Sequence, residues 1–226
     1  MKHGPYALPA LNTPAGFLNR DPATRAPAGA LIFISLILLI LASGCAMRPK
    51  IPGTGLDWDQ REVALGQLAN WQAHGRIAVK ADDGGGQGKL HWYQTNAQAR
   101  IQLSGPFGVG AYELAWDSDS LVVSTKAGEV TAAYAGPQAA EQFLVDQLGW
   151  SFPAISIRYW ILGIVDPQFT SARQFDRDGW LIGIEQNDWS IAYDGFLFHQ
   201  DQWLPHKIVM QNNNARVKLI VDQWGL

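Results

Sequence analysis

The sequence predicts a mainly β protein: a strongly curved antiparallel sheet or open barrel of about eleven strands, with three helices covering one opening. Hydrophobic and polar residues alternate with a period of two over most of the chain after residue 70. Short turn sequences, such as Asp178-Gly179 and Asn187-Asp188, separate these segments. Consecutive strands joined by such turns form an antiparallel meander.

The chain begins with a segment typical of an export signal. The apolar run from Leu31 to Leu41 has 11 residues, whereas a helix that spans a bilayer needs about 20. Small residues follow it directly, as in a signal peptide, so we expect residues 1–44 to be removed. The region before the run is long and Pro-rich, so either the basic part of the signal is extended or the true start lies further along the chain.

Cys45 is the only cysteine and ends the small-residue run that begins at Ala42. This spacing resembles a bacterial lipobox, although the usual leucine lies one place further back, at Leu41. In such signals the thiolate is the nucleophile that takes the lipid. The alternative is a plain signal peptide with an incidental cysteine. We expect lipidation of Cys45, and three acyl chains would make the membrane attachment essentially permanent.

Residues 45–56 are expected to form the lipidated amino terminus and a flexible tether, because Pro and Gly recur there. In the sorting system that the lipobox resemblance implies, an Asp directly after the cysteine often retains a lipoprotein in the inner membrane. Ala46 occupies that place, so the resemblance implies the outer membrane.

The expected mature chain, residues 45–226, is acidic. It keeps 14 of the 17 Lys and Arg residues and 19 of the 20 Asp and Glu residues, which gives a net charge of −5. This balance excludes a generally basic nucleic-acid-binding protein. Residues 57–226 are enough for one domain with a hydrophobic core. No cysteine remains to form a disulfide within it, so stability must come from apolar burial.

Asp57 can cap a first helix, from about Trp58 to Asn70, whose apolar side excludes Arg61. From Trp71 the period changes to two, and Gly75 indicates a bend in the first strand. Residues 82–86 are expected to form a turn. Strands are then predicted at residues 71–80, 88–95, 100–104, 110–116, 121–125 and 129–134.

Two further helices are predicted, one from Pro137 to Leu148 and one from Ala154 to Leu162, each followed by a glycine. The last third returns to a period of two. Strands are predicted at residues 173–176, 180–186, 189–194, 207–211 and 216–224.

The turn between two of these strands carries Phe107 at its tip, between Pro106 and Gly108. An exposed phenylalanine is unfavourable in water. Either Phe107 folds back onto the core, or the tip enters a bilayer interface or an apolar partner site.

The sequence contains no recognisable catalytic or metal-binding pattern. Its histidines are not spaced as metal ligands, and it has no G-x-S-x-G motif. The Asp82–Gly86 stretch lacks the spaced carboxylates of a calcium loop. We therefore expect neither an enzyme nor a bound metal or cofactor.

The tryptophans allow two interpretations. Trp92, Trp160 and Trp189 fall on apolar strand faces or helix stripes. A curved sheet must be filled by its own side chains or by a ligand, so these residues either pack in the core or line a lipid cavity. The residues alone leave this choice open.

Several stretches, in their order and spacing, resemble the LolB family of outer-membrane lipoproteins over residues 58–224. They are WQAHGRIAV (71–79), GPFG (105–108), QLGWSFP (147–153), RYWILG (158–163), WSIAYD (189–194), Leu204-Pro205 and LIVDQW (219–224).

The resemblance implies an unclosed antiparallel β-barrel of about eleven strands with a lid of about three helices and an apolar cavity for acyl chains. It implies a monomeric, lipid-anchored protein that faces the periplasm, accepts client lipoproteins from the carrier LolA and inserts them into the outer membrane.

It also implies roles for individual residues. Phe107 matches an apolar residue on a protruding membrane-insertion loop, where the family commonly has leucine. Arg158 matches a basic position of the lid region, although a buried arginine could equally be structural. Two other classes remain: a structural or assembly lipoprotein that binds protein partners without lipid, and an enzyme such as a cell-wall hydrolase, which the missing catalytic pattern disfavours.

Overall fold

The structure, a computed structural model, describes residues 57–81, 84–105, 110–149 and 152–226. The helices are α2 (Trp58–Gly66), α3 (Ala139–Leu148) and α4 (Ala154–Trp160). The strands are β1 (Asn70–Ala81), β2 (Gly84–Thr95), β3 (Gln98–Ser104), β4 (Tyr112–Trp116), β5 (Ser120–Thr125), β6 (Val130–Ala135), β7 (Ser171–Phe175), β8 (Leu181–Gln186), β9 (Trp189–His199), β10 (Gln202–Gln211) and β11 (Ala215–Gly225).

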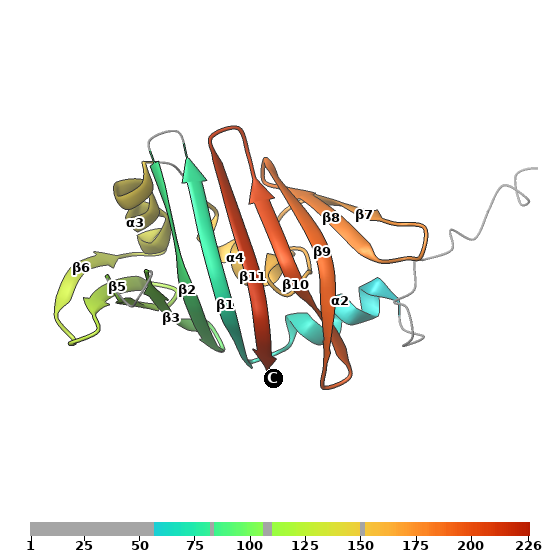
Figure 1. Cartoon of the computed structure of the whole chain (residues 1–226), viewed down its shortest axis with the longest axis horizontal. Coiled ribbons are helices and arrows are strands. Elements are labelled where there is room, and N and C mark those ends of the chain that lie inside the picture. Colours follow the sequence, from blue (N-terminus) through green and yellow to red (C-terminus); the bar gives the residue numbers. More distant parts are fainter. Residues whose placement is uncertain (1–56, 82–83, 106–109, 150–151) are drawn as a thin grey trace, which may run out of the picture. The chain divides into compact units, whose positions relative to one another are not determined.

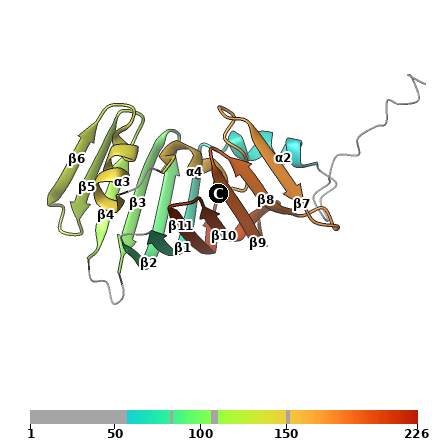
Figure 2. The same ribbon diagram turned by 90° about the horizontal axis from the view of Figure 1, so that it is seen from above.

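All eleven strands belong to one antiparallel sheet, in the order β6-β5-β4-β3-β2-β1-β11-β10-β9-β8-β7 (Figure 1). The strands β6 and β7 stand at the two ends of this order, as Figure 2 also shows, and the sheet is therefore open. The predicted mainly β class, with an open antiparallel sheet of eleven strands and three helices, is confirmed.

The pairing of β1 with β11 joins two meanders, β1–β6 and β7–β11, into this single sheet. The ladder runs from Gln72 opposite Gly225 to Ala81 opposite Ala215, and its register shifts between His74 and Gly75. A Cβ atom at Gly75 would overlap the carbonyl oxygen of Ile220. Only glycine therefore fits this bulge, and the predicted bend is confirmed.

Several strands extend beyond their predicted ends, and three of them do so by four residues or more. The predicted turn at residues 82–86 is too long, since β2 already begins at Gly84. The strand β9 continues to His199. The strand β10 already begins at Gln202 and therefore contains Pro205. Proline is tolerated because β10 pairs with β11 only from Lys207 onward.

The three helices pack against one face of the sheet, which we call the inner face. Figure 1 shows α4 behind the central strands. Trp58 and Leu65 of α2 and Trp160 of α4 are buried in the main core with strand residues such as Leu204 and Ile208. A second cluster joins α3 to β4 and β5. None of the helices in the described ranges is long and apolar enough to cross a membrane.

The first helix differs from its prediction in two respects. The helix ends at Gly66 rather than Asn70, and Arg61 is completely buried instead of lying on a solvated side. An arginine can occupy a core position when backbone carbonyl groups accept its hydrogen bonds.

The Arg61 guanidinium holds α2 against β10 and the segment after α4. It donates hydrogen bonds to the carbonyl oxygens of Leu162 (2.6 Å), Gly163 (2.7 Å) and Trp203 (2.9 Å). It also lies over the ring of Trp58, 4.8 Å from its centroid. Burial lowers the pKa of Arg61 to about 10, which reflects the free-energy cost of removing the charge from water.

All these contacts lie within the compact unit that begins at Arg48. A chain of residues 48–226 therefore contains the whole described sheet, its core and its three helices, and can be studied without the preceding segment.

We expect Arg61→Leu to lower the free energy of unfolding by about 3–5 kcal/mol, because three buried carbonyl oxygens lose their donor. Urea denaturation of residues 48–226 measures this. The free energy of unfolding of Arg61→Lys should lie between those of Arg61→Leu and the parent, since an ammonium lacks the planar fork of donors. Arg177→Leu, exposed in the turn before β8, is the matched control and should unfold like the parent. An Arg61→Leu variant as stable as the parent would contradict the assigned role.

Candidate functional site

An apolar pocket of about 240 Å³ lies between the inner face of the sheet and the helices α3 and α4. Gln147 is the single polar residue among the 18 that line it. The strands contribute Ile77, Val79, Leu90, Trp92, Ile101, Leu103, Leu114, Trp116, Leu121, Val217 and Leu219. Ala140, Phe143, Leu144, Gln147, Phe152, Ala154 and Ile157 complete the wall.

The period-two pattern and the strand register together build this wall. Trp92 on β2 lies opposite Ile101 on β3, which in turn lies opposite Leu114 on β4. On the other side, Val79 of β1 lies opposite Val217 of β11. Rows of inward side chains on six strands therefore face the same space.

Protein atoms do not fully bury many of these side chains. Half-buried members are Ile77, Val79, Ile101, Leu103, Trp116, Phe143, Leu144 and Ile157. Side chains that face a void lose dispersion contacts on that side. Apolar cavities of about 150 Å³ stay dry and bind molecules such as benzene. The lining residues include no nucleophile, acid or base, so the chemistry they support is the burial of an apolar chain.

Trp92 is the sequence candidate that lies on the pocket wall. Its side chain is 2% exposed, and its indole N–H donates a hydrogen bond to Oε1 of Gln94 at 3.0 Å. The amide of Gln94 in turn donates to the carbonyl oxygen of Asn96 at 2.9 Å. These bonds fix the orientation of the indole ring against the pocket.

Trp160 and Trp189 lie in the adjoining core instead of lining the pocket. Phe152, which does line it, packs edge-on against both rings, with centroid distances of 6.2 Å to Trp160 and 4.8 Å to Trp189. The Trp160 indole N–H donates to Oε1 of Gln186 at 2.8 Å. Both tryptophans therefore support the pocket wall from behind.

Arg158 is half-buried on α4 and does not line the pocket. Its guanidinium donates a hydrogen bond to the hydroxyl of Tyr159 at 2.9 Å and lies 4.6 Å from the centroid of the same ring. Tyr159 therefore holds the charged group of Arg158 at the helix surface.

The other sequence candidates, Cys45, Pro106, Phe107 and Gly108, lie outside the described residues. The strands on either side of the predicted loop are described, and β3 ends at Ser104 while β4 begins at Tyr112.

Sequence reasoning missed most of the pocket. The sequence predicts a strand at residues 100–104, which contains Ile101 and Leu103, but nothing in it assigns them to a cavity with Leu114 and Leu121. The available signal was the inward position of apolar residues on consecutive strands. The missing information was the strand register, which decides the inward side chains that lie next to one another, and the packing of α3 and α4 against them.

The chain is similar to known proteins over most of its length. Residues 69–224 match the family described as "Outer membrane lipoprotein LolB". The outer-membrane lipoprotein LolB of Nitrosococcus oceani is 31% identical over 198 residues, which cover 85% of this chain and 96% of the relative. The LolB protein of Pseudomonas syringae pv. syringae is 28% identical over 197 residues, covering 86% and 94%.

Among solved structures, a LolA superfamily protein from Nitrosomonas europaea aligns with a TM-score of 0.48 at 10% sequence identity, covering 74% of this chain and 92% of that one. The family match spans most of the domain and includes the strands and helices that form the apolar pocket. The chain therefore belongs to the LolB family of outer-membrane lipoproteins and has a role in lipoprotein localisation.

Proposed function

We propose that this protein accepts lipoproteins from the periplasmic carrier LolA and inserts them into the outer membrane, and that it holds their acyl chains in the apolar pocket during the transfer. The observation that carries the proposal is the pocket itself, with 17 apolar residues among the 18 that line it. A site of this composition suits a hydrocarbon chain and offers little to a polar ligand.

The transfer is passive. The sequence has no nucleotide-binding motif, so differences in affinity must set the direction. Each methylene group that becomes better buried contributes about 0.8 kcal/mol. An acyl chain therefore moves from a carrier that buries it less well to this pocket, and then to the bilayer, where its burial is complete.

Lipidation of Cys45 keeps the domain at the membrane surface. After removal of residues 1–44, the 12 residues from 45 to 56 form a tether whose fully extended length is about 40 Å. The domain then works as a monomer on the periplasmic side, within reach of both the carrier and the bilayer. Phe107, between Pro106 and Gly108, enters the membrane interface and opens a path for the client.

We expect Ile157→Trp to weaken the binding of a fluorescent fatty acid to residues 48–226 by about fifteenfold, because the indole occupies the space of about two methylene groups. Ile157 lines the pocket from α4. Ile155→Trp is the matched control on the same helix, since Ile155 is 41% exposed, and it should bind like the parent. Thermal unfolding checks that both variants are folded.

The same two variants test the hand-over. Residues 48–226 are mixed with a complex of the carrier and a lipoprotein, and the lipoprotein is followed by affinity capture. Ile155→Trp should receive it like the parent, and Ile157→Trp should receive much less. Equal transfer to both variants would refute the pocket as the acyl site. A parent domain that takes up neither fatty acid nor lipoprotein would favour an assembly protein without lipid.

For the loop, we expect Phe107→Glu to retain the fold and fatty-acid binding but to lose the insertion of bound lipoprotein into vesicles, because a carboxylate resists entry into the bilayer interface. Phe107→Leu keeps an apolar tip and should insert normally. Flotation of the lipoprotein with the vesicles measures insertion. Normal insertion by Phe107→Glu would exclude this role.

A further inference from the structure

The face of the sheet opposite the helices, which we call the outer face, is positively charged at its centre. The strands β1, β2 and β11 are neighbours in the sheet. They carry five cationic residues and a single carboxylate, that of Asp222. The five are Arg76, Lys80, Lys89, Arg216 and Lys218, and we call them the cationic strip. This concentration contrasts with the excess of acidic residues in the chain as a whole.

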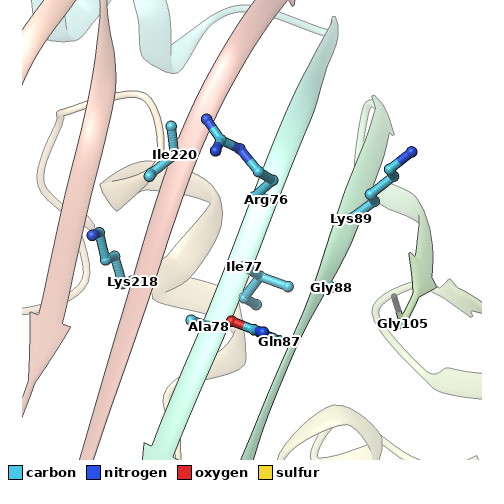
Figure 3. A pocket seen from close by; sticks show the side chains of 9 residues that line it. All are labelled: Arg76, Ile77, Ala78, Gln87, Gly88, Lys89, Gly105, Lys218 and Ile220. Atoms are coloured by element: carbon cyan, nitrogen blue, oxygen red, sulfur yellow. The ribbon is translucent and has the colours of Figure 1, made fainter. Parts of the chain in front are cut away.

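Three members of the strip, Arg76, Lys89 and Lys218, line a hollow of about 380 Å³ (Figure 3). Lys218 and Lys89 lie on opposite sides of it, with Arg76 on the strand between them. Ala78 and Gly88 leave the middle open because they have little or no side chain. A Cβ atom at Gly88 would overlap the carbonyl oxygen of Ser104, so the close approach of β2 and β3 excludes larger residues.

The cations around the hollow differ in how far they are neutralised. Arg76 forms a bidentate pair with Asp222, with distances of 2.9 Å from Nη2 to Oδ1 and 3.2 Å from Nε to Oδ2. Among the described residues, no ion pair involves Lys89 or Lys218. The two ammonium groups stand at the rim of the hollow and point outward (Figure 3), so both remain available to a ligand.

We propose that this hollow binds the phosphate of an anionic phospholipid headgroup at the membrane surface. The ammonium groups match the charge of a phosphate. Ile77 and Ile220 add apolar surface, which suits the glycerol and the first carbons of the chains better than it suits an acidic peptide. Gly105 also lines the hollow, so a headgroup bound there would lie beside the segment that leads to Phe107.

This site differs from the apolar pocket, since its cations project from the opposite face and it binds a charged group, although Ile77 lines both. It does not depend on the proposed acyl transfer. A lipid bound at the cationic strip would orient the domain on the bilayer, whereas the tether alone leaves it free to rotate.

Vesicle binding by residues 48–226, which lack the acylated cysteine, tests the proposal. The parent should sediment with vesicles that contain phosphatidylglycerol and much less with pure phosphatidylcholine. The double variant Lys89→Gln, Lys218→Gln should bind about twenty-fivefold more weakly, since each cation near the surface contributes about fivefold. The matched control Lys126→Gln, Arg177→Gln removes the same charge from exposed turns and should bind like the parent.

A third variant should act in the opposite direction. Asp222→Asn frees Arg76 from its carboxylate and should strengthen binding to the same vesicles by about fivefold. The Arg76–Asp222 pair is exposed, so its loss should leave the fold intact. Fatty-acid binding should be unchanged in all these variants, which separates a failure of this site from a failure of the acyl pocket.

Three results would overturn the proposal: unchanged vesicle binding by Lys89→Gln, Lys218→Gln; an equal loss in the matched control; or equal binding of the parent to both vesicle types. If the double variant instead loses binding to the carrier protein and keeps vesicle binding, the cationic strip is a protein-docking surface.

Discussion

The fold depends on the antiparallel pairing of β1 with β11, which brings the first and last strands of the chain together. This ladder turns two separate meanders into one sheet. It also fixes the side to which each residue points. Val79 and Val217 lie opposite one another and line the pocket, while the next pair along, Lys80 and Arg216, belongs to the cationic strip. A slip of one residue would exchange the two faces, so this register specifies both surfaces at once.

The pocket also depends on residues that do not touch its interior. Gln186 accepts hydrogen bonds from the Trp160 indole and the Asp166 amide, and its own amide group donates to the carbonyl oxygens of Asp166 and Phe169. It thereby holds α4 and the following segment to β8. Arg61 binds the same segment from the other side, through Leu162 and Gly163. The position of α4, and with it one wall of the pocket, follows from these two buried polar side chains.

Features that depend on local interactions could be predicted from the sequence, whereas features that depend on contacts between distant residues could not. The strands, the helices and the bulge at Gly75 were predictable because alternation, capping and glycine act locally. The pocket was not, because its wall requires the register of six strands and the docking of two helices. Arg61 was placed on the wrong side of α2 because its polar partners lie about 100 and 142 residues away. The sequence pattern at Trp160 and Trp189 fits a cavity wall and a core equally well. Their ring contacts with Phe152 show that both lie in the core beside the pocket.

The hydrogen bonds of Arg61 have a mechanical consequence. The chain enters the fold at Asp57 and passes at once into α2, so tension on the preceding segment is applied first to this short helix. Arg61 passes part of that load to β10 and to the segment after α4. The load is thereby shared between these elements and the chain that leads from α2 to β1.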